Sequence, residues 1–318
     1  MTRVYLNGMD ISDRVISTSI EESLTADAQI RISPVEITVS NRDSAYFRAG
    51  KSHLPPGIAL SLIEVRIEMD TGTWTGVLSG IDTHQLGLAV LTAESRLAQI
   101  MSAPVTASIM YATPAQAIAI LAASAGLRTG TGLAIANAEQ DGIMVNVLLT
   151  EADNISLSQA ISSIAELASM RLIVSDNALD AAVPHSLTPF WRIGSPEAVA
   201  IQGYSKIREI DGYSVAYIGS GGVPKSGGAA KGNIWTQECG PASWLQVCDG
   251  GSASALGEKA MLRPRWSLVA ITRKDAVYAT PGSVMHIDIP EIGMNETAVV
   301  VGVAHEDDWQ KITLEERR

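Results

Sequence analysis

The stretch PVEITVSNR, residues 34–42, decides the fold class that this chain is expected to adopt. Its apolar and polar residues alternate, so three apolar side chains share one face: Val35, Ile37 and Val39. A period of two is typical of a strand with one buried face. Residues 62–69 repeat the alternation, and turn residues at 70–73 lead into another strand pattern. The N-terminal third therefore predicts short antiparallel strands in a barrel or sandwich.

The hydrophobic period changes to that of helices in the middle of the chain. Thr113 suits an N-cap, Pro114 suits the first helical turn, and Gly126 suits the C-terminal end of the same helix. A second helix is expected to begin at Ser156, because Gln159 three residues later completes a capping box. These signals predict a small mixed α/β region.

Strand patterns resume at residues 198–203 and 213–219, and four more lie between residues 265 and 315. The intervening stretch, residues 219–232, is rich in glycine and predicts a flexible loop. Residues 252–262 predict a third helix, which a proline then stops.

We therefore expect a mainly β protein with an α/β insertion (α+β class), built from two antiparallel β-barrel domains plus a small helix-containing domain. The expected divisions are a first β-barrel at residues 1–101, a small α/β domain at 102–190, a second β-barrel at 191–220 and 263–318, and an inserted glycine- and serine-rich loop with a helix at 221–262.

The composition excludes several classes of protein. Hydrophobic residues make up 46% of the 318 residues and charged residues 18%, which excludes a disordered chain. The net charge is −11, from 23 Lys plus Arg against 34 Asp plus Glu. A nucleic-acid reader needs cations to displace phosphate counterions, so sequence-specific binding of nucleic acid is not expected. The same sign argues against docking on an anionic membrane.

No membrane insertion or disulfide framework is expected. Residues 97–127 carry no charge, but Pro104 and Pro114 interrupt them, so a continuous spanning helix is not predicted. The N-terminus lacks the basic start and apolar run of a signal peptide. Cys239 and Cys248 have no second pair or nearby histidine, and we interpret them as reduced thiols.

Histidine and carboxylate patterns do not predict an active site. His305 and Glu306 begin like the zinc motif H-E-x-x-H, but Trp309 occupies the second ligand position. The acidic residues after His305 are most simply a solvated turn between two strands. His286 shares a strand face with Asp288, a pattern that exposed sheet residues also give.

Glycine-rich and acidic patterns are equally uninformative about catalysis. The loop with Lys225 and Lys231 lacks the spacing of a phosphate-binding loop, and residues 128–132 are expected to follow a helix rather than a strand. The pair Glu315 and Glu316 fits exposed charges better than acid–base chemistry. The sequence therefore predicts no catalytic, cofactor-binding or metal-binding residues, and no cofactor.

Three tryptophans near the glycine-rich stretch are candidate interface residues: Trp235, Trp244 and Trp266. Tryptophan is enriched at interfaces because it buries a large area and keeps a polar N–H. Core packing is the alternative for each of them.

Several stretches occur in an order that resembles one protein family. They are VYLNGMDISDRV at residues 4–15, ITVSNRD at 37–43, TPAQAI at 113–118, NISLSQAI at 154–161 and VVVGVAH at 299–305. In this order they resemble the baseplate hub, or tail-tip hub, of tailed bacteriophages and related contractile injection systems.

The resemblance implies a homotrimer in which each subunit supplies two similar β-barrels, the first like a tail-tube domain. Three subunits would form a pseudo-sixfold ring between a hexameric tail tube, or distal tail protein, and a central spike or tail fibre. It implies a place in the virion tail tip or baseplate, a channel for DNA, contact with the tape measure protein, and no catalytic residues.

Other functions stay open at this stage. The chain could be another tail-tip ring component, such as a distal tail or minor tail protein. A tail-associated cell-wall hydrolase would need a pair such as Glu306 and Asp308 in a cleft. A glycan-binding module would expose the three tryptophans together.

Overall fold

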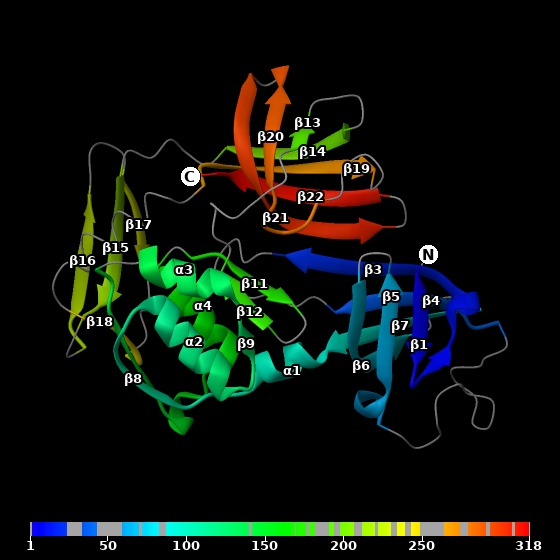
Figure 1. The fold of residues 1–318 in the computed structure, drawn as a ribbon, viewed down its shortest axis with the longest axis horizontal. Coiled ribbons are helices and arrows are strands. Elements are labelled where there is room, and N and C mark those ends of the chain that lie inside the picture. Colours follow the sequence, from blue (N-terminus) through cyan, green and yellow to red (C-terminus); the bar gives the residue numbers. More distant parts are fainter. Residues whose placement is uncertain are drawn as a thin grey trace. The chain divides into compact units, whose positions relative to one another are not determined.

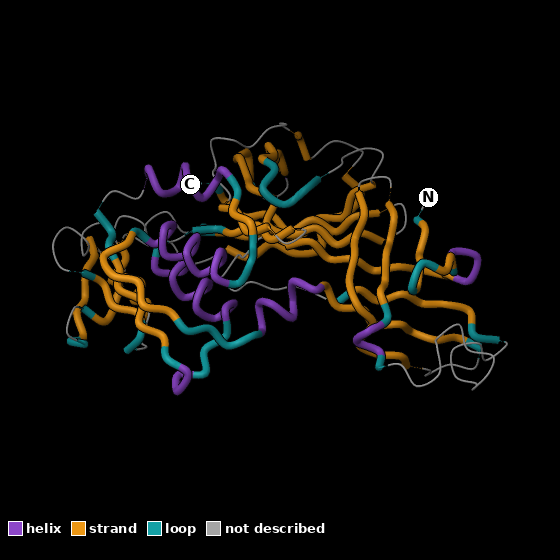
Figure 2. The backbone as a smooth tube through the Cα atoms, turned by 60° about the horizontal axis from the view of Figure 1, so that its bottom comes forward, coloured by secondary structure: helices purple, strands orange, loops and turns teal. Residues whose placement is uncertain are grey.

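The fold was analysed in a computed structural model of the chain (Figures 1 and 2). The structure describes residues 2–23, 34–42, 59–69, 72–82, 87–139, 142–168, 170–175, 178–181, 191–193, 198–206, 212–219, 222–229, 234–238, 243–248, 264–273, 279–290, 293–306 and 309–317. Two compact units are present. Unit 1 comprises Met1–Glu22, Ile32–Ile100 and Ala304–Lys311, and unit 2 comprises Ser23–Arg31, Met101–Val303 and Ile312–Arg318.

Unit 1 contains an antiparallel sheet, coloured blue to cyan in Figure 1. Its strand order is β3-β4-β7-β6-β5-β1-β2. The strands are β1 (Arg3–Leu6), β2 (Met9–Asp10), β3 (Val15–Ser23), β4 (Val35–Ser40), β5 (Glu64–Met69), β6 (Gly72–Asp82) and β7 (Leu88–Ser95). Two 3-10 turns, η1 (Ser12–Arg14) and η2 (Leu60–Leu62), precede β3 and β5, and helix α1 (Arg96–Ser102) follows β7.

The alternation seen in the sequence accounts for the core of unit 1. Val35, Ile37 and Val39 of β4 are buried, whereas the residues between them are half-buried or exposed. Val65 and Ile67 of β5 are buried in the same cluster. The predicted strands in this part of the chain are therefore confirmed, together with the faces that they bury.

Unit 2 contains a second large sheet with the order β14-β19-β22-β21-β20-β13. Its strands are β13 (Trp191–Ile193), β14 (Ala198–Lys206), β19 (Trp266–Arg273), β20 (Val284–Ile289), β21 (Met294–Glu306) and β22 (Trp309–Glu316). Buried side chains from β19, β20, β21 and β22 form a core cluster. The strands predicted in the C-terminal part of the chain are confirmed, although the end of β21 and the start of β22 are assigned to unit 1.

The two large sheets share one strand order. In unit 1, β2 pairs only with β1, and the remaining strands are β1 and β3 to β7. When the six strands of each sheet are numbered from 1 to 6 along the chain, both sheets have the spatial order 2-3-6-5-4-1. One difference is that β1 is antiparallel to β5, whereas β13 is parallel to β20. The same order in two sheets of one chain indicates an internal duplication.

The middle of the chain forms an α/β part within unit 2. Its helices are α2 (Pro114–Ser124), α3 (Thr131–Glu139) and α4 (Leu157–Leu167). One three-stranded sheet has the order β18 (Leu245–Val247), β10 (Val145–Leu149), β8 (Ala107–Ala112), and another the order β11 (Leu172–Ser175), β12 (Ala178–Ala181), β9 (Arg128–Thr129). The short 3-10 turn η3 (Glu151–Asp153) precedes α4.

The two predicted helices of this part have the expected caps. Thr113 and Ser156 each accept a hydrogen bond from the backbone N–H three residues later, and Gln116 and Gln159 complete the capping boxes. Gly126 has a φ of 76°, the left-handed conformation that glycine adopts after a helix. Helices α2 and α4 pack against each other through buried alanine, leucine and isoleucine side chains.

Helices α1 and α3 were not predicted. Residues 128–132 follow helix α2, as expected, and they contain the short strand β9, which pairs in parallel with β12, and the start of α3. Helix α3 begins inside a glycine-containing segment, TGLAIANAE, whose apolar residues do not gather on one side. Its apolar pattern therefore gave no helical signal.

The prediction of a flexible loop over residues 219–232 is wrong for residues 224–229. Residues Pro224–Ala229 form β16, which pairs with β15 (Gly212–Ile218), and β17 (Ile234–Glu238) pairs with the other edge of β15. Glycine weakens a strand but does not exclude one, and here backbone pairing with β15 holds the glycine-containing segment as a strand. The helix predicted at residues 252–262 lies outside the described residues.

The fold class is mainly β with four α-helices in the described part of the chain, as Figure 2 shows by its predominance of strands. The mainly β prediction is confirmed, and closure of the two large sheets into barrels remains a prediction. In the described residues, no helix has the length and apolar character needed to cross a membrane.

The caps provide a test of the α/β part. Ser156→Ala removes the side-chain acceptor at the start of α4, and we expect it to lower the free energy of unfolding by about 1 kcal/mol. Ser163→Ala, the same chemical change inside α4, should have no destabilising effect because alanine is the better helix former. Urea denaturation measures both. Equal losses for the two variants would contradict the capping role.

Candidate functional site

The candidate interface tryptophans do not form an exposed cluster. Trp244 is 6% exposed and Trp266 is 4% exposed. Trp266 belongs to the core of the second large sheet, and its Nε1–H donates to Glu296 Oε2 at 2.7 Å. Trp235 lies on β17, and its side chain lies outside the described part of the structure. Trp244 and Trp266 therefore have packing roles within the chain, and the glycan-binding hypothesis loses the exposed platform that it requires.

The histidine and carboxylate candidates do not converge. His286 and Asp288 lie half-buried on β20, and Glu306 ends β21, with Asp308 outside the described residues. Among the described residues, no three metal-binding side chains of the His, Cys, Asp and Glu types lie together. Cys248 is a buried free thiol near Asn146, and Cys239 lies outside the described residues.

The glycines at residues 128–132 surround a carboxylate of the chain itself. Asp180 Oδ1 accepts a hydrogen bond of 2.8 Å from the backbone N–H of Leu133, in the first turn of α3. A Cβ at Gly130 or Gly132 would collide with Asp180. This segment therefore holds an internal helix cap. In the other glycine-rich stretch, Lys225 lies on β16 opposite Tyr217, and Lys231 is outside the described residues.

A largely buried ion pair joins Arg171 and Glu315 in unit 2. Arg171 Nη2 donates to Glu315 Oε2 at 2.8 Å, and the two side chains are only 19% and 11% exposed. Burial lowers the pKa of the Arg171 guanidinium from its usual value, and the charge of Glu315 opposes that shift. The pair joins the residue before β11 to β22, so it fastens the α/β part to the second large sheet.

Apolar contacts accompany this ion pair. Ile173 of β11 packs against Val299 and Val301 of β21. The next residue of β22, Glu316, accepts a hydrogen bond of 2.7 Å from the backbone N–H of Arg265. The adjacent pair Glu315 and Glu316 thus serves two structural contacts. The prediction that these are exposed charges is wrong for Glu315, which is buried.

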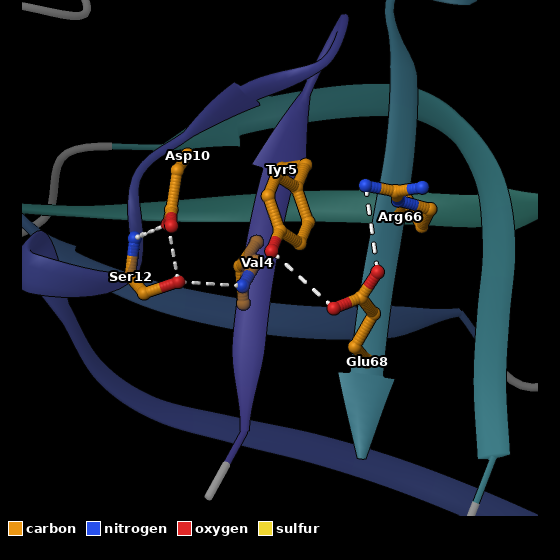
Figure 3. A network of polar contacts seen from close by, with 6 residues as sticks. All are labelled: Val4, Tyr5, Asp10, Ser12, Arg66 and Glu68. Atoms are coloured by element: carbon orange, nitrogen blue, oxygen red, sulfur yellow. Dashed lines mark hydrogen bonds and ion pairs between the residues drawn. The ribbon is translucent and has the colours of Figure 1, made fainter.

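A second network organises the N-terminal motif of unit 1 (Figure 3). Asp10 accepts hydrogen bonds from the hydroxyl and the backbone N–H of Ser12, and the Ser12 hydroxyl accepts from the backbone N–H of Val4 at 2.9 Å. These bonds from Ser12, its side chain first, lower the pKa of the Asp10 carboxyl. Asn7 and Gly8 form the preceding turn with positive φ values of 46° and 80°.

Beside this turn, three side chains lie together on the outer side of β1 and β5 (Figure 3). The Arg66 guanidinium lies 4.4 Å from the centre of the Tyr5 ring, and the Tyr5 hydroxyl donates to Glu68 at 3.3 Å. Arg66 and Glu68 also form an ion pair of 3.4 Å. The pair is solvent-exposed, so its effect on stability is small, but it fixes the direction of three side chains.

Sequence reasoning missed Arg171, Asp180 and the Tyr5 group. Their partners are distant along the chain, 144 residues away for Arg171 and 47 for Asp180. No local spacing signals such pairs. The nearest signal is that Arg171 is a charged residue between a buried helix and a buried strand, a place where an unpaired charge would be costly.

The chain shares its fold with solved phage tail proteins. The chain is similar over 99% of its length to a tail protein from Neisseria meningitidis, with 96% of that chain covered, a TM-score of 0.64 and 12% identity. A 43 kDa tail protein of prophage MuSo2 from Shewanella oneidensis gives a TM-score of 0.66 at 9% identity, with 99% and 98% coverage. The chain thus has the fold of these tail proteins.

A third similar structure belongs to a secretion apparatus. It is the E. coli protein c3393, a component of the type VI secretion system with structural similarity to T4 bacteriophage tail proteins gp27 and gp5. The TM-score is 0.54 at 11% identity, with 99% of this chain and 76% of that chain covered. No family model matches the sequence, and no curated protein matches it.

The ion pair gives a test of how unit 2 is held together. Arg171→Met leaves the Glu315 carboxylate buried without the arginine charge, and we expect a loss of about 3–5 kcal/mol in unfolding free energy. The double variant Arg171→Met with Glu315→Leu should recover much of this loss, because no buried charge remains. Urea denaturation of the single and double variants measures the effect.

A matched control is the more exposed pair of Arg265 and Glu316, where the arginine side chain is 44% exposed and the ion-pair distance is 3.9 Å. Arg265→Met should lose less than about 1 kcal/mol. If Arg171→Met were no more harmful than Arg265→Met, the proposed fastening role would be wrong.

Proposed function

We propose that the chain is a structural hub of the baseplate or tail tip of a tailed phage. Three copies would form a pseudo-sixfold ring that joins a hexameric tail tube to a central spike or tail fibre and leaves a channel for DNA. A distal tail protein or the tube protein would contact one side, and the tape measure protein is a further partner. The role would be structural, without enzymatic activity, and its place would be the virion tail tip or baseplate.

The observation that carries this proposal is the shared strand order of the two large sheets. One chain offers two similar sheets, so three chains in a closed ring offer six. A threefold protein built in this way can match a sixfold tube without six identical copies. The fold similarity to tail proteins, which extends over 99% of the chain, supports the same conclusion.

The second sheet also has an edge strand. Among the described strands, β14 pairs with β19 alone, and residues 201–206 are all exposed, including Ile201 at 45% and Tyr204 at 41%. An exposed edge strand with apolar side chains is a template for pairing with another chain. In the proposed ring, β14 would therefore lie at a junction between copies.

The charge of the chain suits a DNA channel. A net charge of −11 per copy gives a ring whose field repels DNA. If acidic side chains line the channel, DNA would pass through the ring without being retained on its wall.

Another tail-tip ring component, such as a distal tail or minor tail protein, is compatible with the same fold similarity. The number of copies separates the two functions, because such a ring is expected to contain six copies rather than three.

Native mass spectrometry of the purified full-length chain tests the proposal. Three copies of 33.6 kDa give a species of about 100 kDa, which is the expected result. A species of six copies would favour the other ring component. If the chain alone is a monomer, the measurement is repeated with the tube protein present, and failure to form any ring there would contradict a hub.

A further inference from the structure

An uncharged surface with exposed apolar side chains lies on the outer face of the β18-β10-β8 sheet. The inner face is buried through residues such as Ile109, Val147 and Leu245, and α2 packs against β8 and β10. The strand register places another set of residues on the outer face. This outer set, called here the β8 face, comprises Ser108, Met110, Tyr111, Asn146, Leu148 and Gln246.

A β-bulge places two consecutive large side chains on the β8 face. Val145 pairs with Ala112 and Val147 pairs with Ile109, so Met110 and Tyr111 together lie opposite the single residue Asn146. In a regular strand, one of two neighbours would point inward. Here Met110 is 61% exposed and Tyr111 is 68% exposed. Bulges commonly redirect side chains at functional surfaces.

The bulge holds Tyr111 in an unfavourable backbone conformation. Its φ is 51°, a left-handed value that glycine or asparagine adopts readily and tyrosine rarely does. A side chain of the neighbouring strand β10 stabilises this conformation, because Asn146 Oδ1 accepts a hydrogen bond of 2.8 Å from the Tyr111 backbone N–H. The thiol of Cys248, the residue after β18, also contacts Asn146 Oδ1, at 3.4 Å. A strained residue that is fixed in this way and exposes an aromatic ring points to a role outside the folding of the chain itself.

The chemistry of the β8 face selects the partner. None of its six residues is charged, although the chain carries a net charge of −11. Two copies of an acidic chain repel each other overall, so a face that adds no further negative charge favours close contact between them. Depletion of charge with exposed Tyr and Met is also the composition of interface centres. A cationic partner would gain nothing from this neutral face.

We propose that the β8 face docks a second copy of this chain, with Tyr111, Met110 and Leu148 as its centre. This inference rests on the proposed ring and assigns one of the surfaces through which neighbouring copies meet. The contact is made by side chains. The bulge twists the edge strand β8 away from the flat geometry needed for strand addition.

The test uses the full-length chain and three variants. Tyr111→Asn removes the ring but keeps a residue that tolerates positive φ, and Leu148→Gln removes the second apolar side chain. Ile120→Gln, at a 49% exposed isoleucine on helix α2, is the matched control. Association is measured by native mass spectrometry and sedimentation over a dilution series, and folding by the midpoint of thermal unfolding.

We expect Tyr111→Asn and Leu148→Gln to raise the dissociation constant of the trimer about tenfold or more, with Ile120→Gln unchanged. The unfolding midpoint of the dissociated Tyr111→Asn chain should equal or exceed that of the dissociated parent chain, because the backbone strain is relieved. A photoreactive phenylalanine analogue at position 111 should form a crosslink to a peptide of this same chain.

Three results would overturn the inference. If the parent chain forms the ring and both β8-face variants assemble equally well, the surface is wrong although the hub function stands. If the crosslink forms to a different tail protein, the occupant is wrong. If the parent chain forms no ring even with the tube protein, the proposed function fails and this inference fails with it.

Discussion

Each of the two large sheets must bury one face, and this constraint underlies the rest of the structure. The apolar residues at every second position of β4, β5, β19 and β20 satisfy it within the chain. The shared strand order shows that both sheets use the same topology to bury that face. In the part of the chain that the structure describes, the β14 edge and the β8 face are exposed, and these are the surfaces that we propose to meet other copies. The fastening of Arg171 to Glu315 keeps the α/β part, which carries the β8 face, attached to the second sheet.

Much of the fold could be predicted because it depends on local patterns. Alternation predicted the strands, and Thr113 and Ser156 marked the helix starts. The failures have physical reasons. Helix α3 lacks an apolar stripe, and β16 is a glycine-containing strand stabilised by its pairing with β15 rather than by its side chains. Composition alone cannot distinguish such a strand from a loop.

The candidate functional surfaces were beyond prediction for a different reason. The Tyr111 side chain lies on the outer face only because a bulge opposite Asn146 breaks the alternation. No residue type in the sequence predicts that register shift. The ion pair of Arg171 with Glu315 joins residues 144 positions apart. Conversely, the tryptophans that composition singled out include two that pack in the interior of the chain, Trp244 and Trp266. Exposure and partner choice depend on tertiary contacts, which a single sequence does not contain.

In the proposed ring, one chain carries two equivalent sheets so that three copies match a sixfold tube. A cryo-electron microscopy map of the assembled ring, refined with no imposed symmetry, would resolve this arrangement. We expect six similar sheet densities that alternate between two kinds, with true threefold symmetry once side chains are visible. Six identical densities from six chains, or a ring to which each chain contributes only one of its two sheets, would contradict it.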